Sequence, residues 1–391
     1  MVYCMYDFDK EVNRRNTESL KWDVADQELP MWVADMDFEA APEIREALAK
    51  KVEHGVFGYN IIPEEWNLAY KKWWKNRHDF EMDSDWLIFV TGVVPILSSV
   101  VRKLTTPGEN VLLQTPVYNN FFNSILNNGR NVLESPLVYH EGKYTVDLDD
   151  LENKLANPQT TLMILCNPHN PIGKIWERET LAKIGELCEK HHVVVVSDEI
   201  HCDLTAPGME YIPFASVSEA CRENSITCIA PTKTFNLAGL QSAAAVVPNP
   251  NLRHKVWRAL NTDEVAEPNS FALTAAIAAF EQGEGWLLEV RQYIQSNKEM
   301  AVDFMKKELP ELTVVSTDAT YLLWIDCSKV CSDSKAMADY IRKSTGLYLT
   351  AGAEYGAAGN SFLRLNAACT KKNLQDGLQR LKVGIRGFKE C

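Results

Sequence analysis

Residues 193–201 carry the sequence Val-Val-Val-Val-Ser-Asp-Glu-Ile-His, in which four consecutive valines lead into a carboxylate. An uninterrupted run of β-branched residues is typical of a strand that is covered on both faces. The preceding segment, 177–191, has apolar residues at helical spacing with polar residues between them. A helix followed by a buried strand predicts a parallel sheet in an α/β domain.

The same alternation of short apolar runs and longer amphipathic stretches extends over the middle of the chain. Further strands are predicted at 86–90, 110–113, 161–166, 225–230 and 243–247. We expect these strands to form a mostly parallel sheet covered by helices, in a large domain over residues 45–280.

The pattern changes near residue 281. A long helical stretch follows, and then strand candidates at 321–325 and 361–365 with another helix between them. This order predicts a smaller α+β domain, formed by the N- and C-terminal segments, 1–44 and 281–391. Because no glycine- and serine-rich linker separates the two domains, we expect the boundary to lie within helical structure.

Composition excludes several classes of function. The chain has 391 residues, 46% of them apolar and 24% charged, and a net charge of −13. An acidic protein is poorly suited to sequence-independent binding of nucleic acid, which depends on dense lysine and arginine. No apolar run approaches the roughly 18 residues that span a bilayer. We therefore expect a small-molecule ligand and no contact with nucleic acid or membrane.

The N-terminus and the cysteines predict a cytoplasmic protein. The first nine residues have neither a basic start nor an apolar core, so they do not form a secretory signal. The ten cysteines are scattered, as reduced thiols are, and predict no disulfide framework. Two close pairs, Cys221 with Cys228 and Cys327 with Cys331, lack the second pair that a zinc site would need, so no metal is expected.

The stretch Pro231-Thr-Lys-Thr-Phe-Asn-Leu-Ala-Gly239 places Lys233 among small and hydroxyl-bearing residues directly after an apolar run. A desolvated lysine can form a Schiff base with an aldehyde cofactor and act as a base. The alternative is an exposed loop lysine. Five other segments match what a pyridoxal phosphate site requires, and together they favour the first interpretation.

Two of these segments supply partners for the cofactor ring. Asp198 ends the strand at 193–197, where it can keep a pyridine nitrogen protonated; alternatively it caps the next helix. In Cys166-Asn-Pro-His-Asn-Pro-Ile-Gly-Lys174, Asn170 can donate to a ring oxygen or merely satisfy a turn. His201 can reach a cofactor oxygen or simply pack.

The remaining three segments supply a phosphate site, a stacking ring and a carboxylate site. Gly92 separates a strand from a helix, so the N–H groups of Val93 and Val94 can point at a phosphate, although such a glycine is often only a turn. Tyr118 can lie over the ring or belong to the core. Arg364 can bind an α-carboxylate with two parallel hydrogen bonds or form a surface salt bridge.

These motifs resemble fold-type I pyridoxal phosphate enzymes of the class I/II aminotransferase superfamily, and the resemblance covers nearly the whole chain. Within that superfamily the chain is similar to the cystathionine β-lyase group of carbon–sulfur lyases, often called the MalY/PatB family. The resemblance rests on Lys233's segment, on Tyr6-Asp-Phe-Asp9, Ser19-Leu-Lys-Trp-Asp23 and Tyr321-Leu-Leu-Trp-Ile-Asp326, and above all on Trp32-Val-Ala-Asp-Met-Asp-Phe38.

The resemblance implies a role for each candidate residue. Lys233 would carry the cofactor, Asp198 would pair with its ring nitrogen, Asn170 would contact its ring oxygen and Tyr118 would stack on it. The phosphate would be held by Val93, Val94 and Thr232, with His201 near the cofactor. The substrate would be bound by Arg364, Trp32, Ala34 and Tyr321.

The resemblance also implies a homodimer with shared active sites, because Tyr59 matches a tyrosine that binds the phosphate of the neighbouring subunit. One position departs from many aminotransferases of the superfamily: Gln241 stands where they carry a phosphate-binding arginine. Phosphate binding must then depend on helix N–H groups and hydroxyls.

The implied activity is the α,β-elimination of cystathionine or a related cysteine S-conjugate to pyruvate, ammonia and a thiol. Transamination is the first alternative, since it uses the same cofactor site. The sequence weakly disfavours a dicarboxylate substrate, because no arginine lies between Arg258 and Arg291. A regulatory role through a protein partner is the second alternative.

Overall fold

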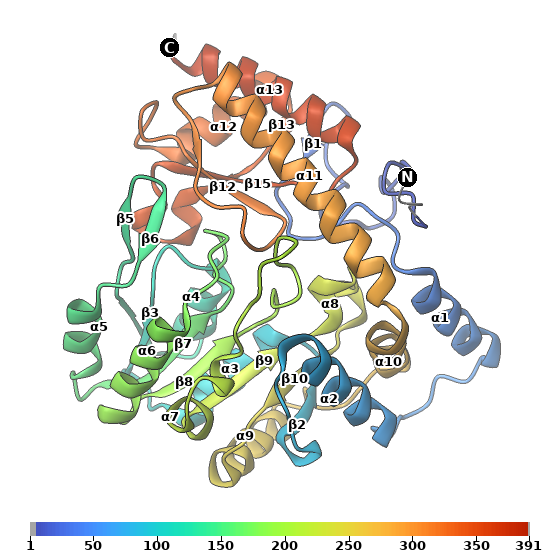
Figure 1. Ribbon diagram of the computed structural model, residues 1–391, viewed down its shortest axis with the longest axis vertical. Helices are drawn as coiled ribbons and strands as arrows, with labels where there is room; N and C mark the ends of the chain where they lie inside the picture. Colours follow the sequence, from blue (N-terminus) through green and yellow to red (C-terminus); the bar gives the residue numbers. More distant parts are fainter. Residues whose placement is uncertain (1–4, 390–391) are drawn as a thin grey trace.

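The computed structural model describes residues 5–389, and its centre is a seven-stranded sheet (Figure 1). In spatial order its strands are β2 (Leu87–Val90), β10 (Ala243–Val246), β9 (Ser225–Ile229), β8 (Val194–Asp198), β7 (Thr160–Cys166), β3 (Asn110–Leu113) and β4 (Asn131–Glu134). Only β10 runs antiparallel to its neighbours. The predicted α/β fold with a mostly parallel sheet is confirmed.

The six strands predicted for this sheet lie within one residue of those observed, and β4 is the one strand of this sheet that was missed. Its sequence, Asn-Val-Leu-Glu, has two apolar residues, and all four residues stay at least partly exposed at the sheet edge. The strand β4 therefore lacks the continuous apolar run by which the other strands of this sheet were recognised.

Helices cover both faces of the sheet. On one face Ile88, Val90 and their neighbours pack against α3 (Val93–Leu104), α4 (Asn119–Leu126) and α9 (Pro250–Thr262). The opposite face packs against α2 (Glu64–His78), α10 (Ala272–Gln282), α5 (Leu148–Leu155) and α6 (Arg178–Lys190). The remaining elements of this part are α1 (Pro42–His54), α7 (Glu219–Glu223), α8 (Pro231–Thr234) and the hairpin of β5 (Val138–His140) and β6 (Lys143–Thr145).

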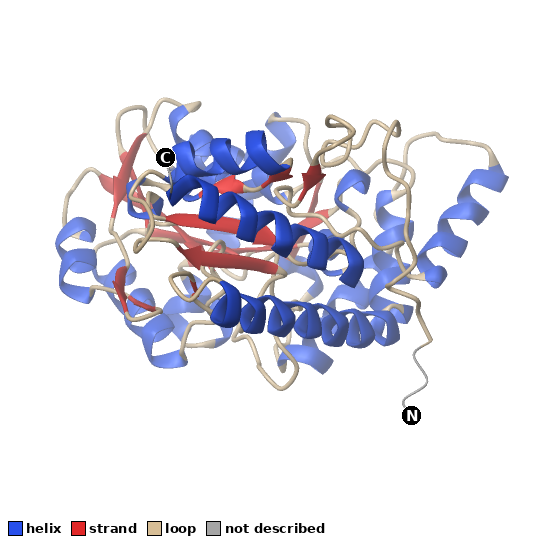
Figure 2. Cartoon of the chain, turned by 90° about the horizontal axis from the view of Figure 1, so that it is seen from above, coloured by secondary structure: helices blue, strands red, loops and turns tan. Residues whose placement is uncertain are grey.

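A second, four-stranded antiparallel sheet lies above the first in Figure 1. Its strands, in spatial order, are β11 (Thr313–Val314), β12 (Leu322–Asp326), β15 (Phe362–Asn366) and β14 (Thr350–Ala351). The helices α11 (Glu284–Glu308), α12 (Ser334–Thr345) and α13 (Lys371–Lys389) pack over it, as the view from above shows (Figure 2).

The N-terminal segment joins this second layer. Its strand β1 (Leu29–Pro30) pairs in parallel with β13 (Leu347–Tyr348), and Leu29 and Met31 belong to the same apolar core as α12 and α13. The expected boundary at residue 280 falls at the end of α10, one turn before α11 begins. The division into domains at residues 44 and 280 stays a prediction.

Two further expectations concern the described residues. Among their helices, none combines the length and the apolar character that a membrane crossing requires. Eight cysteines lie in this part of the chain, all as free thiols, and seven of them are buried. That the cysteines are reduced stays a prediction.

Candidate active site

Lys233 lies in α8, a helix of one turn that begins at Pro231, a residue whose fixed φ suits the first helical position. Its Nζ donates to the backbone carbonyl of Ala34 at 2.6 Å, and the hydroxyl of Tyr321 donates to the same oxygen at 2.8 Å. Three of the predicted site residues therefore meet at one atom, although they are about 90 to 290 residues apart in sequence. The alternative of an exposed loop lysine is wrong.

The surroundings of Lys233 reduce the basicity of its amine. Burial lowers the pKa of Lys233, Asp35 and Asp198 oppose this effect, Arg364 adds to it, and the resulting pKa is about 8. No described carboxylate lies within 4.0 Å of this amine. Above pH 8 Lys233 therefore has a lone pair available as nucleophile or base.

Asp198 ends strand β8 and is 5% exposed. Burial raises the pKa of Asp198 to about 7, and the N–H of Ile200 and the charge of Lys233 offset this only in part. A turn rather than a helix follows Asp198, so the helix-cap alternative is wrong. A buried carboxylate without a cation in contact is a ready partner for a protonated ring nitrogen.

His201 lies near Lys233 as a neutral group. Burial lowers the pKa of His201 to about 3, and the charges of Lys233, Arg364 and Lys298 act in the same direction. Its Nδ1 has no hydrogen-bond partner among the described residues, and its ring meets that of Tyr321 edge-on at 6.0 Å. The unpaired nitrogen gives His201 a free position toward a ligand.

Arg364 comes from β15, in the second sheet, and is 5% exposed. Its Nη1 donates to Oδ1 of Asn170 at 3.4 Å, its Nη2 donates to the carbonyl of Trp32 at 2.7 Å, and its Nε has no partner among the described residues. No described carboxylate forms an ion pair with it. The surface salt-bridge alternative is wrong, and the buried guanidinium retains capacity for an anionic ligand.

Trp32 contributes to the site through its backbone rather than its ring. The carbonyl accepts from Arg364, whereas the indole stacks on Tyr348 with 4.7 Å between ring centres and 13° between planes. The guanidinium of Arg342 covers the other side of Tyr348, 3.5 Å from the ring centre. Substrate contact by the indole of Trp32 stays a prediction.

The predicted phosphate cradle has the backbone that it requires. Val93 and Val94 open helix α3, and Gly92 precedes them. The first N–H groups of a helix have no partner within the helix and carry its positive end. Thr232 is buried beside Lys233, and Gln241 is exposed. The roles of these residues stay predictions.

Tyr118 opens helix α4 and lies near Asp198 and Arg364, whose charges influence its hydroxyl. Burial raises the pKa of Tyr118, and the hydroxyl accepts from Nδ2 of Asn120 at 2.6 Å. Its ring meets Phe121 edge-on at 5.7 Å, so at least part of the ring belongs to the core.

Tyr59 does not join this cluster. It lies between α1 and α2, fully exposed at the edge of the chain, and the neighbouring Val56, Phe57 and Ile61 are also exposed. A run of uncovered apolar side chains is unusual for a monomer and typical of an interface. Its position is compatible with a role in a neighbouring subunit and incompatible with one in its own.

Several residues beside the site were not predicted. Nδ2 of Asn236 donates to the carbonyls of Met36 and Phe38, which ties the loop after Lys233 to the segment that contains Ala34. Nδ2 of Asn366 donates to the carbonyls of Val33 and Asp35. Asn236 lies in the quoted stretch Pro231–Gly239, three residues after Lys233, and Asn366 lies two residues after Arg364. This proximity to a predicted site residue is the signal that could have identified them.

The acidic side chains of the string Trp32–Phe38 form ion pairs with basic residues of the N-terminal segment. Arg14 bonds both Asp35 and Asp37, and the buried Lys21 donates to Asp37 at 3.0 Å. The acidic residues of the Trp32–Phe38 string thus bind cations of the N-terminal segment, while the carbonyls of the string face Lys233 and Arg364. No local sequence pattern predicts that Arg14 and Lys21 pair with Asp35 and Asp37.

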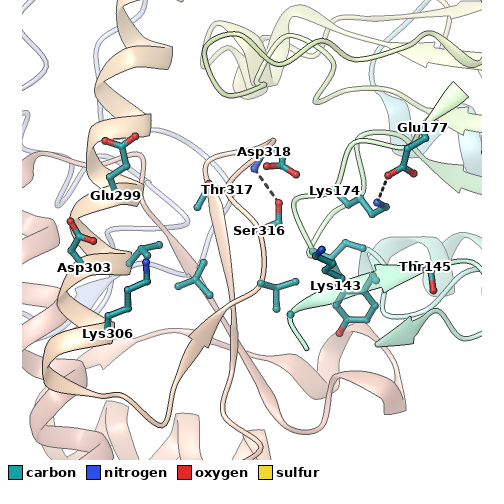
Figure 3. A pocket seen from close by; sticks show the side chains of 16 residues that line it. Lys143, Thr145, Lys174, Glu177, Glu299, Asp303, Lys306, Ser316, Thr317 and Asp318 are labelled. Carbon is teal, nitrogen blue, oxygen red and sulfur yellow. Dashed lines mark hydrogen bonds and ion pairs between the residues drawn. The ribbon is translucent and has the colours of Figure 1, made fainter. Parts of the chain in front are cut away.

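A separate cleft of about 770 Å³ lies between the β5–β6 hairpin, α11 and the segment before Ala319 (Figure 3). Its charged lining is mixed, with Lys143, Lys174 and Lys306 among acidic groups that include Asp303. None of the residues predicted for the site lines this cleft. It is therefore distinct from the cluster around Lys233.

The cluster fits pyridoxal phosphate. It offers an amine of low basicity, a buried carboxylate without a cation in contact, an imidazole nitrogen without a partner and a helix N-terminus. In the same order, these groups are suited to bind the aldehyde, the ring nitrogen, the ring oxygen and the phosphate of the cofactor.

Comparison with known proteins agrees with this geometry. Residues 31–381 match the family model for aminotransferase class I and II. The chain is 43% identical to the cystathionine beta-lyase PatB of Bacillus subtilis, over 97% of this chain and 99% of that one, and 34% identical to protein MalY of Escherichia coli, over 98% and 100%. Cystalysin from Treponema denticola, solved with pyridoxal 5′-phosphate, superposes with a TM-score of 0.95 at 33% identity, over 98% of this chain and 100% of that one.

Proposed function

The chain belongs to the aminotransferase class I and II family and is a pyridoxal-phosphate-dependent carbon–sulfur lyase; from this premise we propose that it cleaves cystathionine or a related cysteine S-conjugate by α,β-elimination at Lys233. The observation that carries the proposal is the meeting of a low-basicity amine, Lys233, with a buried guanidinium, Arg364, that no described carboxylate neutralises. A substrate with an amino group and a carboxylate satisfies both.

Pyridoxal phosphate, when bound, supplies an aldehyde that reacts with amines and a ring that withdraws electrons from the substrate's α-carbon. Asp198 would hold the proton at the ring nitrogen, since its own carboxyl lacks a cation in contact. Nδ2 of Asn170 would donate to the ring oxygen, because its Oδ1 already accepts from Arg364. The N–H groups of Val93 and Val94, with Thr232, would hold the phosphate.

Lys233 moves the protons of the reaction. In its neutral form Nζ removes the proton from the substrate's α-carbon, and as an ammonium it returns a proton to the departing sulfur. General acid–base assistance of this kind is typically worth about 10²–10⁴-fold. The Ala34 carbonyl, which accepts from Nζ at 2.6 Å, keeps the amine oriented between these transfers.

Arg364 orients the substrate. Two parallel N–H donors match the two oxygens of an α-carboxylate, and the contact with the Trp32 carbonyl fixes the plane of the guanidinium. The carboxylate would neutralise a buried charge, so its binding gains electrostatic energy that a surface arginine could not provide.

We infer that the enzyme is a homodimer in which Tyr59 of one subunit binds the phosphate in the other. The exposed apolar run around Tyr59 and its absence from its own site support this arrangement. A cytoplasmic location is proposed because the described cysteines are free thiols, which persist in a reducing compartment.

Transamination remains the alternative outcome of the same cofactor chemistry. Purified enzyme with pyridoxal phosphate is incubated with L-cystathionine, and pyruvate, ammonia and free thiol are measured. A parallel reaction contains aspartate and 2-oxoglutarate. Equal amounts of pyruvate and thiol establish β-elimination, whereas glutamate formation without thiol release makes the enzyme an aminotransferase and overturns the proposal.

Lys233→Ala tests the residue itself. The variant is expected to bind the cofactor without the absorption band of the lysine-linked form and to lose nearly all turnover. Lys298→Met is the matched control, because Lys298 is also a buried lysine that donates to backbone carbonyls, those of Thr317 and Ala319. The control should keep the band and most of the turnover; near-normal turnover in Lys233→Ala would remove Lys233 from this role.

A further inference from the structure

Asp203 lies five residues after Asp198 and is 1% exposed, yet no ligand or reaction step described above uses it. Its carboxylate accepts from Nε1 of Trp73 at 3.1 Å and from Nε of Arg77 at 3.1 Å. Nε2 of His78 lies 3.1 Å from the same carboxylate. The buried carboxylate of Asp203 thus contacts three side chains of helix α2.

A fourth donor connects this anion to the active site. Oγ1 of Thr234 donates to Oδ2 of Asp203 at 3.0 Å, and Thr234 is the residue after Lys233. Successive residues of a helix point about 100° apart, so fixing Thr234 on the side of Asp203 fixes the direction of Lys233. A helix of one turn cannot hold itself rigid, because nucleation of an isolated turn is unfavourable.

The same carboxylate also fixes the loop that carries the other cofactor-facing groups. Asp203 follows Asp198 and His201 in one turn-rich segment. Arg291 of α11 holds the next part of that segment, because its Nε donates to the carbonyl of Thr205 at 2.8 Å. The two segments that present the amine and the carboxylate to the cofactor therefore share one anchor.

The anchor stays charged. Burial opposes ionisation of Asp203, but the hydrogen bond from His78 and the charges of His78 and Arg77 lower its pKa to about 2. His78, Cys202 and Asp203 lie close enough together to suggest a metal site, but Arg77 already bonds the carboxylate, and burial raises the pKa of the Cys202 thiol. The observations favour a structural anion over a metal ligand.

We propose that Asp203 is a positioning residue for the reaction: through Thr234 it holds the one-turn helix of Lys233, and through the chain it holds Asp198, so that amine and carboxylate keep their mutual orientation. This inference rests on the proposed role of Lys233. Neither Asp203 nor Thr234 is expected to touch substrate or cofactor.

The test compares Thr234→Val, which removes the hydroxyl and keeps the shape, with Thr234→Ser, which keeps the hydroxyl. The cofactor-free proteins are treated with limiting acetic anhydride over a range of pH. Acetylation of Lys233 is measured by mass spectrometry relative to the exposed Lys255. In the unchanged protein the pH profile of Lys233 should have its midpoint near 8.

Thr234→Val is expected to raise this midpoint by on the order of one pH unit, because an ammonium released from its fixed place regains hydration. Thr234→Ser should restore the original midpoint, and Asp203→Asn should raise it at least as much as Thr234→Val. The groups that face the amine, Asp35, Asp198 and Arg364, are unchanged in all three variants.

The proposal is overturned if Thr234→Val lowers the thermal midpoint of unfolding but leaves the Lys233 profile unchanged, since Asp203 would then be merely structural. If Thr234→Val does not fold, the Lys233 profile of Thr234→Ala is measured in the same way, and an unchanged midpoint in that variant overturns the proposal. The cofactor-free profile does not depend on activity, so a failure here is distinct from a failure of the proposed function, which would appear as a retained absorption band in Lys233→Ala.

Discussion

The side chains of Lys233 and Tyr321 donate to the same backbone oxygen, that of Ala34, at 2.6 and 2.8 Å. The two residues come from different sheets of the molecule, since Lys233 follows β9 and Tyr321 precedes β12. The shared acceptor lies in the string Trp32–Phe38, which belongs to neither sheet. This string therefore connects the two parts of the enzyme at the amine of Lys233.

Tyr321→Phe should weaken this junction without leaving a buried acceptor unpaired, because Lys233 still donates to Ala34. We expect the free energy of unfolding of the cofactor-free protein to fall by about 1 kcal/mol, the usual worth of one hydrogen bond, as measured by urea denaturation. Tyr139→Phe is the control: its hydroxyl donates to Asp326 at 2.8 Å, outside the site. Only Tyr321→Phe should also lower the elimination rate; equal rates in the two variants would contradict the coupling.

Arg364→Lys should weaken substrate binding while leaving cofactor content unchanged. A lysine cannot offer two parallel donors, and a charged hydrogen bond contributes about 1.5–3 kcal/mol, so KM should rise on the order of 10- to 100-fold. Arg342→Lys is the matched control, because Arg342 is partly exposed and pairs with Glu28 rather than with a ligand. An unchanged KM in Arg364→Lys would separate this arginine from the substrate carboxylate.

Mixed dimers test the shared site. Tyr59→Ala should lower cofactor affinity and activity, and Lys233→Ala should be inactive. After subunit exchange, a heterodimer contains one site with the intact Lys233 of the first chain and the intact Tyr59 of the second, so activity should return. The control mixes Tyr59→Ala with the double variant, which has no intact Tyr59 to donate; recovery there, or none in the first mixture, would refute the arrangement.

The stability of the cofactor-free protein should depend on His201 below neutral pH. Its folded-state pKa, about 3, lies below the 6.5 of the unfolded chain, so the unfolded state binds the proton first and stability is lost as pH falls through that window. Between pH 7.5 and 5 this contribution is about 2 kcal/mol.

His201→Gln should remove the loss of stability between pH 7.5 and 5 that His201 causes, whatever the effect of the substitution on stability at pH 7.5. The carboxyls of Asp198 and Glu199, with pKa values raised to about 7 by burial, act in the opposite direction and are common to both proteins. The readout is the difference between the urea midpoints at the two pH values. An equal difference in the unchanged protein and the variant would show that His201 does not titrate as described.

Sequence patterns predicted the candidate site residues that follow the ends of buried strands. Asp198 and Lys233 stand directly after the apolar runs at 193–197 and 225–230, and the carboxyl ends of neighbouring parallel strands meet at one edge of a sheet. The fold and these two residues could therefore be derived from local order. Arg364 was left between two interpretations because its burial depends on Trp32, which lies 332 residues away.

The residues that escaped prediction act through distant partners. Asp203 looked like any polar residue in a turn, because the groups that give it a role, Trp73 and Thr234, lie 130 and 31 residues away. The strand β4 escaped for a different reason, its exposure at the sheet edge. The spacing of apolar residues indicates which residues are buried. It does not indicate which buried carboxylate forms hydrogen bonds to which helix.

The pairing of β1 with β13, and the bonds from Arg364 and Asn366 to the segment 32–35, have a consequence for biosynthesis. The segment 29–35 meets these partners only after residues 347–366 have been synthesised. All strands of the central sheet lie within residues 87–246 and can pair before then, whereas the segment that brings the Ala34 carbonyl to Lys233 acquires its last partners only with residues 347–366. Such long-range contacts slow folding, so active enzyme should appear later than compact, protease-resistant protein.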